Sequence, residues 1–445
     1  MDKKILEKKL FFHNPWWREK KMPQELLQDF EKPVLERIKN YCRTLDRIIV
    51  IKGPRRTGKS TLLYQTIDSL LKEKKDPFDI LYLSFDDPSL QMDMEAIFET
   101  YQEIKGETIS ATENKKQIYC FLDEVHFLEN WQLTVKKYFD KKYPIKFFVT
   151  SSSASLFKKG LESLAGRTVE EIILPFSFEE FIRYSFRKDK KFAEFFSKNQ
   201  IAPYENEIKI LFKKYLSKGG FPHILSVEEP SLREKLLRED ILEKAIYKDL
   251  VSLYGVREPQ KLEKVFLYLA DISGQILNVS SLAKNIGLTR PYVEKYLTYL
   301  EKAYLAFRFK NFSLSAGKKL RSPLKVYLVD SGLINLFGGA SPDFILESLV
   351  ARHLLEFEKE VYYFRNYHEV DFVVQTNGKT IPIEVKNKSK LDSEDFKGIM
   401  AFMEKFNLKE GLLLSHDVFG EKKFDGRHIR ILPVWRWALT YKNIL

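Results

Sequence analysis

The chain has 445 residues, of which 44% are hydrophobic and 14% aromatic, so it can form packed cores and exceeds what one core usually supports. Its 74 basic and 62 acidic residues give a net charge of +12, which favours a polyanionic partner without identifying one. No stretch approaches ~18 consecutive apolar residues and the first residues lack a signal-peptide core, so we expect a cytoplasmic protein without membrane contact.

Residues 47–71 combine a β-branched run, a glycine-rich loop and an amphipathic segment. The loop Gly53-Pro54-Arg55-Arg56-Thr57-Gly58-Lys59-Ser60, followed by Thr61, is a complete phosphate-binding P-loop between a strand and a helix. Its glycines let backbone N–H groups surround the phosphates, and Lys59 is expected to contact the β- and γ-phosphates. The Ser60 hydroxyl is expected to be a ligand of Mg2+. The alternative, a glycine-rich turn without a ligand, is disfavoured by the flanking strand and helix. The loop therefore predicts a nucleoside triphosphate site.

A second apolar run, residues 117–128, contains two adjacent acidic residues. A buried parallel strand reads as a continuous apolar run, and α/β sheets bind ligands at the carboxyl ends of such strands. We therefore expect Asp123 to hold Mg2+ and Glu124 to orient and deprotonate the attacking water. The alternative is an acidic cap between a strand and a helix. A carboxylate directly after the Mg2+-binding aspartate disfavours a small-molecule kinase, because it suits the activation of water.

Three further runs, residues 79–87, 145–154 and 169–175, fit the same sheet. Thr150 and Ser151 end the second run, where a polar side chain can sense the γ-phosphate; equally, their hydroxyls can cap the next helix. Arg167, which precedes the third run, is a candidate for neutralising charge in the transition state. The alternative for Arg167 is a surface arginine in a glycine turn.

The motifs GPRRTGKS, FLDEVH, FVTSSSAS, LAGR and PFSFEEF, in this order, resemble the AAA+ family of archaeal and bacterial ATPases that carry a C-terminal domain of unknown function. The stretches YLSKGGFPHIL, KVYLVDSGL, LESLVARHLL, EVDFVV and IPIEVKNK agree, so the resemblance covers nearly the whole chain after Ile48. It implies that the nucleotide is ATP and that the fold is α/β, with a parallel core sheet of strand order 5-1-4-3-2. The implied division is an N-terminal arm (1–45), an AAA+ P-loop ATPase core (46–178), a helical lid (179–230), a winged helix (231–315) and a PD-(D/E)xK nuclease-like domain (316–445).

Residues 278–302 have the pattern of two short helices that precede a wing. Ser280 is expected to cap the first helix and Thr289 the second, whose exposed face offers Arg290, Tyr292 and Lys295. Because Glu294 and Glu301 dilute the charge of this face, the expectation of DNA as a partner rests more on the basic residues near the wing. The alternative is a spacer that couples the ATPase to the end domain through contacts with protein. The basic residues near the expected wing are Lys318, Lys319, Arg321 and Lys325.

Residues 369–388 read as two strands joined by Asn377-Gly378, the strongest short-range signal for a two-residue hairpin. With Thr376 opposite Lys379, Asp371 faces Glu384 and Glu369 faces Lys386, all on one side of the hairpin, and apolar residues fill the other side. Two facing carboxylates repel, so a bound cation is expected between them.

With Glu347 on the preceding helix, these residues match the pattern of PD-(D/E)xK nucleases. In that interpretation Asp371 and Glu384 share Mg2+ or Mn2+ with Glu347 as a helper, and Lys386 positions or activates a water beside the scissile phosphate. In the alternative, Lys386 pairs with Glu369 and the two facing carboxylates are charges on a solvated sheet face.

Together these patterns predict an Mg2+-dependent ATPase that couples ATP hydrolysis to nucleic-acid binding or processing. The alternative is an ATP-gated switch or scaffold that acts on a protein partner, in which the end domain has kept only its fold. The segment HNPWWREKKMP at residues 13–23 leaves two interpretations open: its tryptophans pack on the ATPase core or contact a partner.

Overall fold

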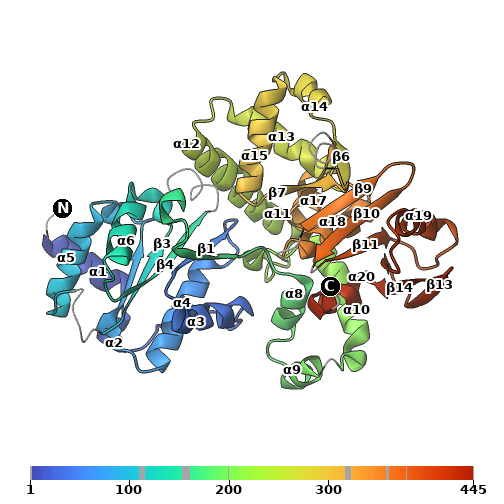
Figure 1. Ribbon diagram of the computed structural model, residues 1–445. Coiled ribbons are helices and arrows are strands. Elements are labelled where there is room, and N and C mark those ends of the chain that lie inside the picture. The colour runs from blue at the N-terminus through green and yellow to red at the C-terminus, as the bar shows by residue number, and fades with distance from the viewer. Residues whose placement is uncertain are drawn as a thin grey trace. The chain divides into compact units, whose positions relative to one another are not determined.

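The computed structural model describes residues 3–109, 116–152, 161–198, 200–315, 322–356, 360–376 and 378–443. The chain divides into two compact units (Figure 1). Unit 1 comprises Met1–Leu174 and Lys248–Gly255, and unit 2 comprises Pro175–Tyr247 and Val256–Leu445. The finer division into five segments stays a prediction. Within the described ranges, no helix is both long and apolar enough to cross a membrane.

Unit 1 is built on a parallel sheet with five strands among its described residues, in the order β2-β3-β4-β1-β5. Read from the other edge, this is the predicted order 5-1-4-3-2, which is confirmed. The central strands are buried along their whole length, as the continuous apolar runs of the sequence indicated. The strands are β1 (Ile48–Gly53), β2 (Ile80–Ser84), β3 (Ile118–Asp123), β4 (Ile145–Ser152) and β5 (Thr168–Ile172).

Helices cover both faces of this sheet. In Figure 1, α4 (Lys59–Lys72) and α6 (Trp131–Asp140) lie on opposite sides of the central strands. Both helices are amphipathic and turn their apolar side chains towards the sheet. The other helices of unit 1 are α1 (Lys3–His13), α2 (Trp16–Glu19), α3 (Val34–Thr44), α5 (Met94–Lys105) and α12 (Val251–Tyr254), with 3-10 turns η1 (Gln24–Leu26), η2 (Pro77–Asp79), η3 (Pro88–Leu90), η4 (Val125–Phe127) and η5 (Leu161–Leu164).

The N-terminal segment packs on the edge strand β2. The Asn14 side chain accepts a hydrogen bond from Tyr82 N (2.7 Å) and donates one to Tyr82 O (3.0 Å), so it replaces a neighbouring strand at that point. The indole nitrogens of Trp16 and Trp17 both donate to Ile80 O, at 3.1 and 2.9 Å. Both rings are buried in unit 1, so the tryptophans pack on the core. This arrangement covers an edge that would otherwise expose unpaired backbone groups.

Unit 2 begins with helices and continues into a long mixed sheet. A capping box starts its first helix, because the Ser177 side chain accepts from Glu180 N and the Glu180 side chain accepts from Ser177 N. The helices are α8 (Phe178–Ser185), α9 (Lys190–Ser197), α10 (Glu205–Lys218), α11 (Pro230–Arg238), α13 (Pro259–Asp271), α14 (Val279–Ile286), α15 (Arg290–Lys302), α17 (Ser331–Phe337), α18 (Pro342–Leu354), α19 (Lys397–Lys405) and α20 (Val434–Thr440), with η6 (Ala202–Tyr204), η7 (Pro222–Ile224), η9 (Glu394–Phe396) and η10 (Tyr441–Asn443). A π-helix, η8 (Glu239–Leu250), begins in unit 2 and ends in unit 1.

The described part of unit 2 holds a sheet of nine strands in the order β13-β14-β12-β11-β10-β9-β7-β8-β6. Strands β7 and β9 lie on either side of the predicted boundary at residues 315 and 316, and they pair in parallel. The middle and end of the chain therefore share one sheet. The strands are β6 (Gln275–Leu277), β7 (Ala306–Asn311), β8 (Leu324–Leu328), β9 (Glu360–Arg365), β10 (Glu369–Thr376), β11 (Lys379–Lys386), β12 (Glu410–Ser415), β13 (Gly420–Phe424) and β14 (Arg427–Pro433).

The expected hairpin is formed by β10 and β11. Thr376 pairs with Lys379 and Phe372 with Ile383, which confirms the predicted register. Both faces of β10 are covered, because Val373 packs beneath α19 while Phe372 contacts Tyr327 of β8. The alternative in which one face of the hairpin is solvated therefore does not hold for β10.

The start of α14 also differs from the expectation. Asn278, not Ser280, is the cap, and its side-chain oxygen accepts a hydrogen bond from Ser281 N at 3.0 Å. Ser280 lies within the helix. Thr289 does stand at the cap position of α15, although its side chain forms no capping hydrogen bond.

Candidate active site

The P-loop joins the end of β1 to the start of α4. Gly53 has φ +147, and a Cβ there would lie 2.0 Å from Ile173 O, so only glycine fits. Gly58, at φ +92, directly precedes α4. The buried Thr57 hydroxyl donates to Pro54 O at 2.9 Å and closes the loop on itself. The loop thus presents backbone N–H groups at a helix N-terminus, the arrangement that binds phosphate.

Lys59 is folded back against this loop. Its side chain is buried, and Nζ donates to Gly53 O and Pro54 O, both at 3.0 Å. These carbonyl contacts hold the ammonium at the mouth of the loop, within reach of a phosphate bound there. Ser60 and Thr61 follow in the first turn of α4 and are half-buried, whereas Arg56 is exposed at φ +63.

Asp123, at the carboxyl end of β3, is surrounded by hydroxyl groups. Tyr82 donates to its Oδ2 at 2.9 Å, and Thr150 donates to its Oδ1. The nearby Ser60 hydroxyl favours the ionised form of this carboxylate and so acts to lower its pKa. Burial, followed by the neighbouring charge of Glu124, raises the pKa of Asp123. A buried carboxylate beside a serine hydroxyl supplies the oxygen ligands that Mg2+ prefers, so these residues fit the expected ion.

Glu124 occupies a strained backbone position, at φ +51 and ψ +45, directly after the strand. Its Oε2 lies 3.1 Å from His126 Nδ1 and accepts from Ser152 N at 3.2 Å. Although burial opposes ionisation, the positive charge of Lys59 and the hydrogen bond from His126 lower the pKa of Glu124 to about 2. The carboxylate is therefore ionised at neutral pH and can accept a hydrogen bond from a water molecule.

Thr150 and Ser151 end β4 beside this pair. Thr150 Oγ1 accepts a hydrogen bond from Glu124 N at 3.1 Å, so one hydroxyl contacts both acidic residues. Ser151 Oγ lies 3.1 Å from His126 Nδ1 and donates to Ser152 O at 3.0 Å. Residues 153–160, where the next helix was expected, lie outside the described residues, so the alternative that these hydroxyls cap it stays a prediction.

Arg167 lies elsewhere in unit 1. Its carbonyl accepts from Ile48 N, at the start of β1, whereas the P-loop leaves the other end of that strand. Its guanidinium pairs with Asp140, at 2.6 Å from Nε to Oδ1 and 3.1 Å from Nη2 to Oδ2. A six-residue strand spans roughly 20 Å, so Arg167 does not reach the P-loop of its own chain.

Arg55, in the P-loop, has a partner from far along the chain. Its Nη2 donates to Asp249 Oδ1 at 2.6 Å, and its Nε donates to Asp249 Oδ2. Both side chains are largely buried, with 19% and 8% exposure. A bidentate arginine–carboxylate pair of this kind is geometrically specific. It fixes the last turn of η8 against the phosphate-binding loop within unit 1.

Three contributors to this site were not identified from the sequence: Tyr82, His126 and Asp249. Strand β2 is aliphatic up to Ser84 except for Tyr82, and it pairs with the strand that ends in Asp123. A single hydroxyl in such a run is a sequence signal for a polar role. His126 follows Glu124 by two residues, so the sequence indicated that the two side chains are close together. Asp249 has no local signal, because its partner is set by the fold.

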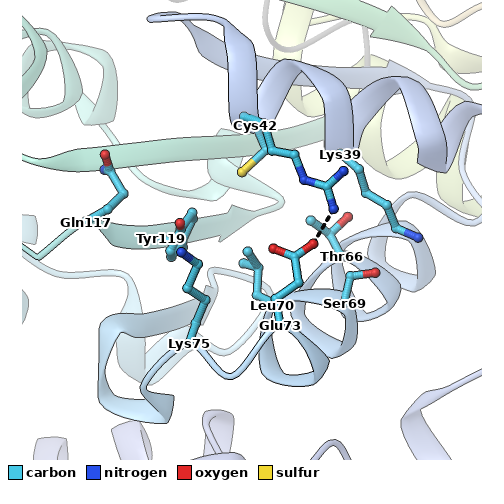
Figure 2. A pocket seen from close by; sticks show the side chains of 10 residues that line it. Lys39, Cys42, Thr66, Ser69, Leu70, Glu73, Lys75, Gln117 and Tyr119 are labelled. Atoms are coloured by element: carbon cyan, nitrogen blue, oxygen red, sulfur yellow. Dashed lines mark hydrogen bonds and ion pairs between the residues drawn. The ribbon is translucent and has the colours of Figure 1, made fainter.

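A separate cavity of about 340 Å3 lies at the opposite end of the sheet from the P-loop (Figure 2). It is bordered by the last turns of α3 and α4 and by Tyr119 near the start of β3, and an ion pair joins Arg43 to Glu73 across it. Burial raises the pKa of the Cys42 thiol to about 11, so the thiol stays protonated and is a poor nucleophile. This cavity is not the nucleotide site.

The residues expected to form a nuclease-like centre lie together in unit 2, around a lysine. Lys325 of β8 is 2% exposed, and its Nζ lies 2.7 Å from Glu347 Oε1, 3.0 Å from Glu369 Oε1 and 3.4 Å from Asp371 Oδ1. We call Lys325, Glu347, Glu369 and Asp371 the Lys325 cluster. Lys325 is therefore not available for contact with DNA, contrary to the expectation from its position near basic residues. Lys318, Lys319, Arg321 and Asn377 lie outside the described residues.

Glu384 and Lys386 form their own pair beside this cluster. Lys386 Nζ donates to Glu384 Oε1 at 2.6 Å, so Lys386 does not take Glu369 as its partner. Burial, followed by the charge of Asp371, raises the pKa of Glu384 to about 8. Burial also raises the pKa of Glu347 to about 8, against the effect of Lys325. In the part of the chain that the structure describes, no group of three or more His, Cys, Asp or Glu side chains is arranged to hold a metal ion.

Comparison with known proteins gives a family match for the region that holds the P-loop. Residues 45–182 match the family model for an AAA domain, whereas residues 209–343 and 343–437 match two domains of unknown function. An uncharacterized protein of Methanocaldococcus jannaschii is 28% identical over 419 residues, covering 89% of each chain. An uncharacterized protein of Haemophilus influenzae is 28% identical over 416 residues, covering 90% of this chain and 98% of that protein.

Two solved structures are distantly similar. A Walker-type ATPase of Pyrococcus abyssi has a TM-score of 0.45 and 14% identity, with 71% of this chain and 97% of that chain covered. DnaA of Aquifex aeolicus bound to AMPPCP has a TM-score of 0.27 and 17% identity, with 60% and 86% covered. Residues 45–182 are thus similar to an AAA domain, and their strand order and P-loop agree with the fold of P-loop ATPases.

Proposed function

We propose that unit 1 hydrolyses ATP to ADP and phosphate in the presence of Mg2+. The observation that carries this proposal is the position of Glu124, an ionised carboxylate held by His126 and Ser152 N directly after the buried Asp123. A carboxylate at that point can orient and deprotonate a water that attacks the γ-phosphate. An acidic strand cap would not need these side-chain contacts.

Each residue of the site has a distinct role in this proposal. The P-loop N–H groups bind the phosphates, and Lys59 leaves the carbonyls of Gly53 and Pro54 to contact the β- and γ-phosphates. Mg2+, held by Ser60 and Asp123, would supply positive charge that neutralises the phosphates. Thr150 and Tyr82 keep the Asp123 carboxylate oriented through their hydroxyls. Because Thr150 also contacts Glu124 N, it links the metal-binding and water-activating residues.

The test is phosphate release from ATP by the full chain, with and without Mg2+. Lys59→Ala should lose nucleotide binding and turnover, because the charge that contacts the phosphates is removed. Lys72→Ala is the matched control, since Lys72 lies at the other end of the same helix and pairs with Asp68 there. Mg2+-dependent turnover in Lys59→Ala equal to that of the control would refute the proposal.

We further propose that unit 2 binds DNA through the exposed face of α15. Tyr292 is 55% exposed, and Arg290 and Lys295 lie beside it on the same helix and are also exposed. An exposed aromatic ring and exposed cations on one helix suit contact with phosphates and with sugar or base surfaces. The helical pair α14 and α15 followed by the antiparallel strands β7 and β8 supports the winged helix expected from the sequence.

The test of this second proposal is DNA retardation by the full chain as a function of salt. Replacing Arg290 and Lys295 with Glu should weaken binding to all sequences alike and reduce the slope of log affinity against log salt by about 1.8. The control pair Lys188→Glu and Lys190→Glu makes the same charge change at exposed positions around the start of α9. Equal loss in both double variants, or no retardation at ~50 mM salt, would favour the alternative of an ATP-gated scaffold acting through protein contacts.

Metal-dependent cleavage of nucleic acid is not part of either proposal. Asp371, Glu384 and Lys386 were expected to carry it, but the ammonium of Lys325 lies against Asp371, where the metal ion was expected.

A further inference from the structure

From β8, Lys325 reaches three carboxylates on two other elements. Glu347 comes from α18, and Glu369 and Asp371 come from β10, which is separated from β8 in the sheet by β9 and β7. A lysine ammonium has three N–H donors, and here three carboxylates lie within 3.4 Å of Nζ. The number of N–H donors on the ammonium thus equals the number of carboxylates around it.

Protein groups other than Lys325 also hydrogen-bond to two of these carboxylates. Tyr327, two residues along β8 and on the same face, donates to Glu347 Oε1 at 2.5 Å. Val385 N donates to Asp371 Oδ2 at 2.8 Å. Lys386 pairs separately with Glu384 Oε1, whereas Glu384 Oε2 is buried without a hydrogen-bond partner. A buried charge is tolerated when it is paired and hydrogen-bonded in this way.

We propose that Lys325 is a permanent internal cation that takes the place of the divalent metal expected between Asp371 and Glu384. A metal bound to Asp371 would lie beside the ammonium and be repelled by it, and the ammonium already satisfies the charge that made a metal necessary. The centre is therefore a structural ion cluster, not a catalytic metal site. It joins β8 to α18 and β10, so that the middle and end of unit 2 fold as one body without a metal.

This proposal does not depend on ATP hydrolysis. Its first test compares the wild-type chain with one variant, and both proteins keep Lys325. Mn2+ is titrated calorimetrically into the nucleotide-free full chain and into Asp371→Asn. Any binding of Mn2+ near the P-loop is common to both proteins and cancels in the comparison. Equal Mn2+ binding by the two proteins is expected. Binding by the wild-type chain that Asp371→Asn abolishes would overturn the proposal, whatever the behaviour of Lys325 variants.

The second test removes the ammonium itself. Lys325→Met should lower the melting temperature of the chain in EDTA, because buried carboxylates lose their cation, and Mn2+ should restore part of the loss. Adding Asp371→Asn to Lys325→Met should abolish that rescue. Lys325→Arg keeps the charge and should melt independently of Mn2+, as the wild type does. A Lys325→Met chain that melts like wild type and gains no Mn2+ dependence would also overturn the proposal.

Discussion

The guanidinium of Arg55 and the carboxylate of Asp249 form a bidentate ion pair within unit 1. Arg55 belongs to the phosphate-binding loop, and Asp249 belongs to the last turn of η8, the π-helix that begins in unit 2. A π-helix is rare and is often found at functional positions. The pair therefore ties the nucleotide site to a helix that leads directly, along the chain, into the other unit.

We expect Asp249→Asn to tighten ATP binding. The substitution removes a negative charge next to the loop that receives the phosphates and frees Arg55 to contact them, so the ATP Kd should fall about threefold to tenfold at low salt. The gain should shrink as salt is raised. Asp249→Glu, which keeps the charge, is the control, and the measurement is equilibrium titration with a fluorescent ATP analogue. Weaker binding by Asp249→Asn would show instead that Asp249 holds Arg55 in its binding position.

The hydroxyl of Tyr82 should matter for turnover more than that of Tyr64. Tyr82→Phe removes the donor to Asp123 Oδ2, whereas Tyr64→Phe removes only the donor to the Tyr82 hydroxyl. We expect kcat to fall about tenfold in Tyr82→Phe, with a higher Mg2+ requirement, because the carboxylate loses one of its orienting hydrogen bonds. Steady-state ATPase assays across a Mg2+ titration measure both effects. Equal and small effects in the two variants would remove Tyr82 from the site.

Asn14 should stabilise unit 1 strongly for an N-terminal residue. Asn14→Ala loses two hydrogen bonds to Tyr82 and one to Leu10 O and leaves the backbone of an edge strand unpaired. The free energy of unfolding should fall by about 2–4 kcal/mol. Denaturant unfolding of the full chain, with the exposed Asn40→Ala as control, makes the measurement. A change below ~0.5 kcal/mol, typical of surface substitutions, would show that the segment is not tied to the sheet.

His353 should make unit 2 less stable in acid. In α18 its Nδ1–H lies 2.8 Å from Leu349 O and its Nε2 accepts from Phe178 N at 3.1 Å, an arrangement that requires the neutral ring. Burial and the charge of Arg352 lower the pKa of His353 to about 3. Below about pH 6.5, the pKa of His353 in the unfolded chain, His353 is protonated in the unfolded chain but stays neutral in the folded chain. Stability should therefore fall as the pH drops from about 6.5 towards 3, by up to about 1.4 kcal/mol per pH unit.

The variant His353→Gln separates this effect from other titrating groups of unit 2. Asp330, Glu347 and Glu384 have pKa values raised to about 6, 8 and 8, so their contributions change in the opposite direction with pH. The difference between wild type and variant isolates the histidine. Denaturant unfolding at pH 7.5, 6 and 5 should show a gap that narrows in acid, because only the wild type loses stability to His353. A gap of constant size would contradict the assignment.

The sequence was most informative where one pattern controls one local structure. Glycines around Lys59 and an apolar strand ending in Asp123 and Glu124 specify a loop and a strand end, and the structure brings them together. Asn377-Gly378 likewise predicted the register of β10 and β11. Contacts that depend on tertiary folding, such as Arg55 with Asp249, carry no such local pattern.

The same limit explains the misplacement of Lys325. The expectation grouped Lys325 with the basic residues before it because they are close in sequence. Side chains alternate in direction along a strand, so closeness in sequence does not place them on one face. In the run Leu324–Leu328, Lys325 falls on the same face as Tyr327, and both side chains are buried. A lysine in register with a buried tyrosine was a signal of an inward-facing charge. Which carboxylates it meets could be learned only from the fold.

The central claim is that Glu124 activates water for ATP hydrolysis, and single-turnover hydrolysis tests it most directly. Radiolabelled ATP is bound to an excess of the full chain, and bound ATP and ADP are separated over time. Glu124→Gln keeps the shape of the side chain and removes the base, so it should bind ATP with Mg2+ as wild type does while the rate of ADP formation falls by at least 100-fold. Glu129→Gln, the same change at an exposed position five residues on, should hydrolyse ATP normally. A Glu124→Gln chain that converts bound ATP to ADP at the wild-type rate would contradict the account.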